Sequence, residues 1–324
     1  DSIAGNSDTE NSEDDEADLT SDLESILGMM KSRGVLERSL RWHYRSRHES
    51  LIRVSNKEFY DDQLIIFPTA LKNHPDYGIR FHYLQHGTYD RGRSRTNRIE
   101  AEAVAKKIMD HAYEHPHLSL GVVAFNLSQK QAIIDQLELL RRDNGSTESF
   151  FNDQSKEPFF VKNLESVQGD ERDVMFISVG YGKGPDGSPT SMNFGALNGD
   201  GGERRLNVLI SRAKQRCEIF SSLTWEDIDL SRTQARGVSA FKTYLRFAKT
   251  GILDNPHSSQ REPDSPFELS VASALRELGF KVEHQVGSAG YFIDLAVVHP
   301  AKPGQYLLAV ECDGASYHSA KSAR

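Results

Sequence analysis

Short, wholly apolar segments alternate with longer amphipathic segments along most of this chain. The run from Val174 to Ile177 is apolar at every position, which indicates a strand buried on both faces and therefore a parallel sheet. Apolar residues spaced three and four positions apart indicate helices between such strands. The predicted strands span 79–84, 121–125, 159–164, 174–180 and 218–223, and the predicted helices span 97–113, 128–141 and 204–214. We therefore predict an α/β fold in which helices cover both faces of a parallel sheet.

Composition shifts divide the 324 residues into four segments. Residues 1–22 contain nine acids and no Lys or Arg, so we expect this acidic segment to be disordered. The parallel α/β domain spans 23–253. A linker rich in Pro, Ser and charged residues spans 254–265. A smaller domain spans 266–324, with a helix over 266–278 and strands over 281–284, 291–298 and 305–313.

The charge and cysteine content exclude several classes of protein. The net charge of -8 comes from the acidic segment, because the remainder has 38 acids against 39 bases, and such a balance excludes neither sign of partner. Two distant cysteines, Cys217 and Cys312, do not make a disulfide framework or a zinc site. No signal segment or membrane-spanning run is present, so we expect a cytoplasmic protein. The chain does not begin with Met, which indicates a fragment of a longer protein.

Two polar segments border the predicted strands and are candidate ligand-binding sites. Ser46 and Glu49 match a capping box, which places Arg45 beside a helix N-terminus where its guanidinium could reach a phosphate; the alternative is an ordinary surface arginine. Gly169 lets a ligand approach the backbone between two buried strands, and Gln168 and Glu171 can bond to a base, a ribose or water. The alternative for this loop is a polar turn.

A third segment contains arginines at helical spacing. In a continuous helix, Arg205, Arg212 and Arg216 fall on one line, opposite a face of apolar residues. This pattern predicts an arginine stripe directed at phosphates, or simply a solvated helix face.

Carboxylates gather in the small domain. Asp294 lies on an otherwise apolar strand face, and Glu311 and Asp313 share one face of the next strand. Converging carboxylates repel one another unless a divalent cation lies between them, so we predict that these three bind Mg²⁺ or Mn²⁺. Glu268 is a fourth candidate, although Ser265 and Glu268 also match a capping box, which would give Glu268 a purely structural role.

Three segments resemble motifs IV, V and VI of superfamily 1 helicases, in the 5′-to-3′ branch that includes RNA-surveillance helicases. In order along the chain, these segments are LRWHYRSRHESLIRVSNKEFY, SVQGDERDVMFIS and RRLNVLISRAK. The segment VVAFNLSQKQAI matches the strand and helix between them. The resemblance implies the second RecA-like domain of a helicase, with a doubly wound parallel sheet.

The resemblance also implies roles for individual residues. Arg45 and Arg212 correspond to the arginines that contact the γ-phosphate of ATP, and Arg205 belongs to the same motif. Glu171 corresponds to a ribose or nucleotide contact, and Gln168 to part of the coupling between nucleotide and strand. Gly169 is a further predicted nucleotide-binding residue. The nucleic-acid backbone contacts correspond to Gln131 and Ser166.

The chain departs from a complete helicase because it contains no G-x-x-x-x-G-K-[ST] motif and no Asp-Glu pair after a buried strand. A first RecA-like domain would supply these phosphate and Mg²⁺ contacts, and we expect it before residue 1. The 324-residue chain alone should therefore lack ATPase activity.

The stretches FIDLAVV, LLAVECDG and YHS resemble PD-(D/E)XK nucleases of the very-short-patch-repair-like type. The resemblance implies a truncated restriction-endonuclease-like α/β domain that uses Mg²⁺ or Mn²⁺. Glu311-Cys312-Asp313 lies where many members have (D/E)-x-K, so the usual lysine is missing and His318 is a candidate to activate water.

These features together predict part of an ATP-dependent DNA helicase with an appended nuclease, acting on single-stranded or duplex DNA in repair or defence. One alternative is a helicase whose terminal domain is a non-catalytic DNA-binding clamp. The other is an RNA helicase, which the surveillance branch favours and the nuclease disfavours.

Overall fold

The computed structural model describes residues 26–69, 74–142, 145–151, 156–253, 265–288, 291–301 and 306–312. The chain divides into two units, Asp1–Arg41 and Trp42–Arg324. The described part of the first unit contains one helix, α2 (Ile26–Ser32), which ends before Gly34. The acidic segment 1–22 lies outside the described residues, as does all of the predicted linker except Ser265.

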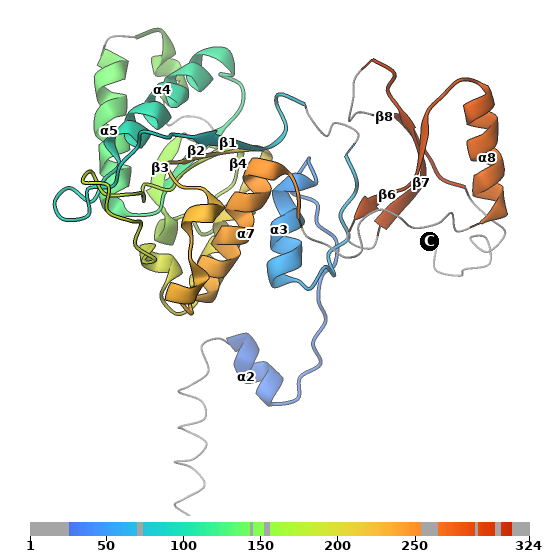
Figure 1. Ribbon diagram of the computed structural model, residues 1–324, viewed down its shortest axis with the longest axis horizontal. Helices are drawn as coiled ribbons and strands as arrows, with labels where there is room; N and C mark the ends of the chain where they lie inside the picture. Colours follow the sequence, from blue (N-terminus) through green and yellow to red (C-terminus); the bar gives the residue numbers. More distant parts are fainter. Residues whose placement is uncertain are drawn as a thin grey trace, which may run out of the picture. The chain divides into compact units, whose positions relative to one another are not determined.

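A five-stranded parallel sheet forms the centre of the second unit (Figure 1). Its spatial order is β1-β5-β4-β2-β3. The strands are β1 (Gly78–Tyr83), β2 (Leu120–Ala124), β3 (Phe160–Asn163), β4 (Arg172–Ser178) and β5 (Ala213–Ser221). β2 is buried at every position, as expected for a strand covered on both faces.

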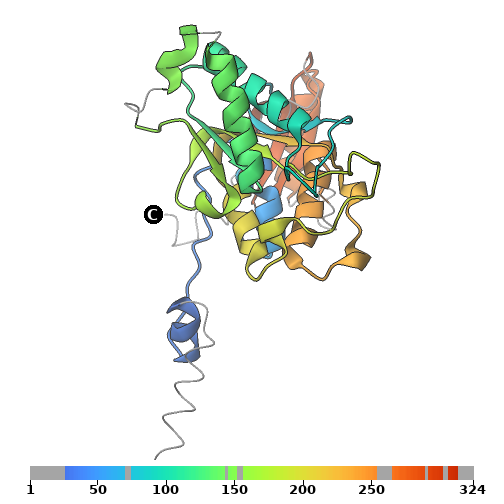
Figure 2. The same ribbon diagram turned by 90° about the vertical axis from the view of Figure 1, so that its left-hand side faces the viewer.

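Helices cover both faces of this sheet (Figures 1 and 2). They are α3 (Ser50–Phe59), α4 (Arg98–Glu114), α5 (Leu127–Arg142), α6 (Gly202–Ile210) and α7 (Arg236–Thr250). Val174 and Phe176 of β4 pack with α4 and α5, whereas the alternate residues Met175 and Ile177 pack with α3, α6 and α7. Short 3-10 helices occupy Gly145–Phe151, Leu164–Ser166, Gly195–Leu197, Trp225–Asp227 and Leu230–Arg232.

A small antiparallel sheet with the order β6-β7-β8 follows. Its strands are β6 (Val282–Ser288), β7 (Tyr291–Val298) and β8 (Tyr306–Val310), and the helix α8 (Pro266–Glu277) packs on them. Ala272 of α8 is buried against Leu295 and Val297 of β7. The predicted fold class, a RecA-like parallel α/β domain followed by a small separate domain, is confirmed; its exact boundaries stay predictions.

The predicted helix over 204–214 is wrong at its C-terminal end. α6 stops at Ile210, and β5 begins at Ala213. Arg216 and Glu218 obscure this strand in the sequence because both are charged yet buried. They pair with each other at 2.8 Å between Arg216 Nε and Glu218 Oε1, and Glu218 Oε2 lies 2.7 Å from His82 Nε2 on β1. No helix among the described residues is both long and apolar enough to cross a bilayer.

Candidate functional site

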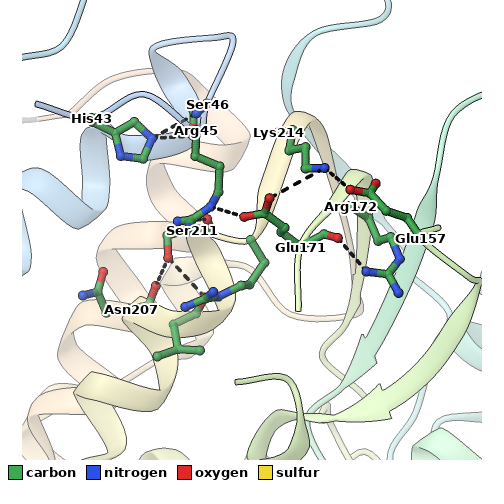
Figure 3. A network of polar contacts seen from close by, with 11 residues as sticks. His43, Arg45, Ser46, Glu157, Glu171, Arg172, Asn207, Ser211 and Lys214 are labelled. Atoms are coloured by element: carbon green, nitrogen blue, oxygen red, sulfur yellow. Dashed lines mark hydrogen bonds and ion pairs between the residues drawn. The ribbon is translucent and has the colours of Figure 1, made fainter. Parts of the chain in front are cut away.

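Arg45 and Glu171 form an ion pair at the centre of the first candidate site (Figure 3). Arg45 Nε donates to Glu171 Oε2 at 2.6 Å, and Arg45 Nη1 donates to the carbonyl oxygen of Ser211 at 3.4 Å. Glu171 directly precedes β4, and Ser211 lies between α6 and β5. The amino ends of two neighbouring strands therefore position this pair. The hydrogen bond from Arg45 lowers the pKa of Glu171, which keeps the carboxylate ionised.

Arg212 reaches the same cluster from the turn between α6 and β5. Its Nε donates to the carbonyl oxygen of Val208 at 2.8 Å. Burial lowers the pKa of Arg212, and the positive charge of Arg45 lowers it further while Glu171 opposes the shift. The structure thus brings Arg45, Glu171 and Arg212 together from three separate segments, and their contacts with a nucleotide stay predictions. Guanidinium groups held near one another favour an anion with several charges, such as a polyphosphate.

The predicted arginine stripe does not exist, because its members lie on different elements. Arg205 is on α6, where its Nη1 donates to the carbonyl oxygen of Asp200 at 2.8 Å. Arg216 is buried in β5, and its Nη1 lies 3.2 Å from Asp76 Oδ1. A helix that ends at Ile210 cannot align Arg205, Arg212 and Arg216. A phosphate contact for Arg205 stays a prediction.

The predicted capping box at Ser46 is also wrong. α3 begins at Ser50, and its N-cap residue, Glu49, makes no capping hydrogen bond through its side chain. Ser46 instead bonds to His43, with 2.8 Å between Ser46 Oγ and His43 Nε2. Burial, aided by the charge of Arg45, lowers the pKa of His43 to about 4. Arg45 nevertheless lies on the segment before a helix, as predicted.

Gln168 and Gly169 form the turn that leads into β4. The backbone N–H of Asp170 closes this turn on the carbonyl oxygen of Val167 at 3.2 Å. Gly169 has φ +90°, a conformation that favours glycine, and no atom lies within 4 Å of the place where a Cβ would be. Gln168 is exposed. The turn is therefore open to a ligand, and contact with a nucleotide stays a prediction.

A cavity of about 660 Å³ lies at the opposite edge of the sheet, where the strands end. Its lining comes from the end of one strand and from the segments that follow four strands: Tyr89, Arg91, Arg95, Phe125, Asn126, Leu127, Ser128, Asn163, Glu165, Tyr181, Ser191, Asn193, Gly195 and Ala196. The carboxyl edge of a parallel sheet is the usual place for a ligand in such folds. Aromatic, amide and arginine side chains together suit a ligand that has both rings and negative charge.

The two predicted nucleic-acid contacts do not line this cavity. Ser166 Oγ bonds within its own turn, to the carbonyl oxygen of Asn163 at 3.1 Å. Gln131 lies on the exposed side of α5, and its Nε2 donates to Asp135 Oδ1 at 2.7 Å. Both side chains are exposed, so their roles stay predictions.

The second candidate site lies in the small domain. Asp294 of β7 accepts a hydrogen bond at Oδ2 from the backbone N–H of Cys312 at 2.7 Å. Gln285 Nε2 donates to Asp294 Oδ1 at 3.4 Å and to Glu268 Oε2 at 3.1 Å. Glu268 is buried, and its backbone N–H is capped by Ser265 Oγ at 3.2 Å, which is the N-cap half of the predicted capping box. Glu268 therefore has a structural role and also faces the carboxylate cluster.

Glu311 follows β8 directly and is exposed. Leu295 pairs with Val310, so the same register places Glu311 opposite Asp294, on the same face. Their oxygens are of the hard type that suits Mg²⁺ or Mn²⁺. Within the described ranges no group of three or more His, Cys, Asp or Glu residues could hold a metal. Asp313 and His318 lie outside these ranges, so the predicted set of ligands stays a prediction.

Comparison with known proteins identifies the larger domain. The AAA_12 family, described as an AAA domain, matches residues 23–224. The chain belongs to this family. Residues 267–324 match a second family, REase_MTES_1575. The predicted resemblance to a superfamily 1 helicase joined to a restriction-endonuclease-like domain is confirmed.

Two curated relatives can be aligned with most of the chain, including the AAA domain. The uncharacterized ATP-dependent helicase MG140 of Mycoplasma genitalium is 28% identical over 286 residues, 83% of this chain and 24% of the relative. Its homolog in Mycoplasma pneumoniae is 27% identical over 317 residues, 92% of this chain and 27% of the relative. This chain thus spans about a quarter of the length of these relatives. A solved structure, the C-terminal domain of a possible DNA helicase from Lactobacillus plantarum, has a TM-score of 0.31 and 12% identity, and covers 55% of this chain and 86% of that chain.

Sequence reasoning missed two charged residues in the AAA domain. Lys214 lies 3.7 Å from Glu171, measured from Nζ to Oε1, and also pairs with Glu157 (Figure 3). Burial raises the pKa of Glu157, but hydrogen bonds from Lys214 and Ser119 outweigh it and leave the pKa below its usual value. Lys214 is part of the quoted helicase motif, so its position was visible. No signal in the sequence indicated Glu157.

Proposed function

We propose that the AAA domain supplies one half of an ATP-hydrolysing site of a nucleic-acid helicase. The observation that supports this most is the cluster of Arg45, Glu171 and Arg212 at the amino ends of β4 and β5. The side chain of Arg45 is 26% exposed and that of Glu171 40%, so a ligand can reach both. The relatives named as ATP-dependent helicases support the same reading.

In this proposal Arg45 exchanges Glu171 for a phosphate oxygen when ATP binds. The freed carboxylate of Glu171 can then accept a hydrogen bond from the ribose, and Lys214 keeps it ionised. Arg212 is held by Val208 and directs its remaining N–H groups at the developing charge of the transferred phosphoryl group. A domain with a phosphate-binding loop completes the site, since this chain has no such motif.

We propose that a nucleic-acid strand binds at the carboxyl edge of the sheet, in the cavity of about 660 Å³. Arg91 and Arg95 provide positive charge for phosphates, and the largely buried rings of Tyr89 and Tyr181 form part of the cavity wall. The restriction-endonuclease-like domain supports DNA rather than RNA as the substrate, and a role in repair or defence.

We propose that the small domain cleaves DNA with Mg²⁺ or Mn²⁺ bound by Asp294 and Glu311, completed by Asp313. The bound cation supplies charge stabilisation for phosphodiester hydrolysis. Asp294 is held in place by donors from both neighbouring strand segments, and Glu311 is exposed to substrate. His318 is the proposed general base.

Steady-state ATP hydrolysis by the full-length protein tests the first proposal. We expect Arg212→Ala to lower kcat by ~10³-fold with little change in nucleotide affinity, because such an arginine acts on transition-state charge. Arg204→Ala is the matched control, since Arg204 is an exposed arginine on α6 that pairs with Glu203. An Arg212→Ala protein with the wild-type rate would overturn the proposal.

Cleavage of labelled DNA in Mg²⁺ tests the nuclease. We expect Glu311→Gln to abolish cleavage, whereas Glu283→Gln, which changes an exposed carboxylate bonded to Tyr306, should cleave normally. The non-catalytic clamp is the second candidate, because the position of the usual lysine is not a lysine in Glu311-Cys312-Asp313. DNA binding by the wild-type protein without cleavage would support the clamp.

A further inference from the structure

Gln285 has an unusual backbone conformation for a residue inside a strand. Its φ is +48°, a left-handed conformation that side chains other than glycine rarely adopt and that is costly unless the surroundings hold it. The pairs His284 with Leu295 and Val286 with Ile293 place Gln285 opposite Asp294. Only 2% of Gln285 is exposed. The surroundings of Gln285 must therefore stabilise this strained backbone conformation.

The hydrogen bonds of the Gln285 side-chain amide hold this backbone conformation in place. One amide nitrogen, Nε2, donates to Glu268 Oε2 on α8 and to Asp294 Oδ1 on β7. Because ionised carboxylates only accept hydrogen bonds, the NH₂ end rather than the oxygen end must face them. The two N–H bonds thus link two carboxylates that would otherwise repel each other.

We propose that Gln285 is a positioning residue of the nuclease site, and that Glu268 acts through it rather than on the metal. This inference rests on the proposed nuclease function. Gln285 fixes Oδ1 of Asp294 from one side, while the backbone N–H of Cys312 fixes Oδ2 from the other. Asp294 is then already oriented before a cation arrives. Partners that orient metal ligands in this way typically change metal affinity by about 10–100-fold when they are removed.

Mn²⁺ binding to the whole chain, measured by electron paramagnetic resonance well below the melting temperature, tests the role of Gln285. Gln285→Leu removes the amide at similar size. Gln285→Gly removes the same amide but adopts φ +48° freely, so it separates the amide from the backbone. We expect both to weaken Mn²⁺ binding by about 10-fold or more. The control is Gln85→Leu, a change at an exposed glutamine, which should bind Mn²⁺ like the wild type.

For Gln285→Glu we expect the opposite change in Mn²⁺ affinity. It places a third carboxylate beside Glu268 and Asp294, so the metal-free protein should melt at a lower temperature and Mn²⁺ should bind more tightly. A purely structural glutamine would lower the melting temperature of Gln285→Leu and Gln285→Gly and leave their Mn²⁺ affinity unchanged.

The possible failures can be told apart. Wild-type Mn²⁺ affinity in both Gln285→Leu and Gln285→Gly would overturn the positioning role and leave the nuclease proposal intact. A wild-type chain that neither binds Mn²⁺ at a site sensitive to Asp294→Asn nor cleaves DNA would overturn the nuclease proposal and the positioning role with it.

Discussion

Glu100 shows how much a single side chain can affect this domain. It lies in the first turn of α4 and is completely buried. Its Oε1 accepts hydrogen bonds from Ser178 Oγ at 2.6 Å and from the backbone N–H of Gly180 at 2.7 Å, so it joins α4 to the end of β4. Burial nevertheless raises the pKa of Glu100 from 4.5 to about 8, against the effect of these bonds.

A raised pKa in the folded state makes stability depend on pH in a defined direction. The folded protein holds the proton of Glu100 more tightly than the unfolded chain does. The stability that this proton binding contributes is therefore fully present below about pH 4.5 and is lost as the pH rises towards 8. Glu100→Gln cannot ionise. We therefore expect its free energy of unfolding, relative to that of the wild type, to be higher at pH 8 than at pH 5. Urea unfolding at the two pH values measures the difference.

Glu102→Gln is the matched control for this measurement. Glu102 lies on the exposed side of the same helix, where its Oε1 pairs with Arg98 Nε at 2.8 Å. Its stability relative to the wild type should barely change with pH. An equal loss of stability in Glu100→Gln at both pH values would show that Glu100 is ionised in the folded state.

At the residue scale, the sequence indicated the proximity of Arg45, Glu171 and Arg212 better than the contacts of Asp294, and the roles proposed for both groups stay predictions. Arg45, Glu171 and Arg212 belong to motifs of fixed order, and the structure brings them together. Gln285 had no such signal, because a glutamine in a strand is unremarkable until its φ and its two carboxylate partners are known. The spacing of Gln285, Glu268 and Asp294 in the sequence does not predict that these side chains are in contact.

At the scale of elements, α6 and α7 approach each other through glycines. A Cβ at Gly202 or at Gly237 would clash with the carbonyl oxygen of Leu197, which lies between the two helices. Only a glycine at each position allows this approach without a shift of the backbone.

Gly237→Ala should therefore lower the free energy of unfolding by roughly 1–3 kcal/mol, because the backbone must move to admit the methyl group. Gly199→Ala is the control, since nothing lies within 4 Å of the Cβ position there and its φ is not positive. It should change the free energy by no more than about 0.5 kcal/mol. Urea denaturation of both variants makes the comparison, and equal stability would contradict the packing argument.

Strands were predicted where they are buried in apolar surroundings and missed where ion pairs replace apolar contacts. β4 is a nearly continuous apolar run and was predicted within a few residues. The beginning of β5 was assigned to a helix because Leu206, Leu209, Ala213 and Cys217 have helical spacing. Burial of Arg216 in that strand is possible only because Asp76 and Glu218 neutralise it, and Asp76 is distant from Arg216 in sequence.

At the scale of the whole molecule, we propose that the chain contributes arginines to an ATP site, whereas its 324 residues contain no G-x-x-x-x-G-K-[ST] motif. We expect the purified 324-residue chain to hydrolyse ATP no faster than buffer, with or without single-stranded DNA, because the backbone N–H groups, the lysine and the Mg²⁺ ligands of that loop are required. A phosphate-release assay measures this. Turnover that rises on addition of DNA would show that the chain forms a complete site by itself.

The most direct test of the account is whether Arg212 contacts the transition state of ATP hydrolysis. ADP with aluminium fluoride imitates the transferred phosphoryl group, so the melting temperature of the full-length protein should rise further with this complex than with ADP alone. We predict that Arg212→Ala keeps the rise caused by ADP and loses the additional rise, while Arg204→Ala keeps both. An additional rise in Arg212→Ala equal to that of the wild type would contradict the account.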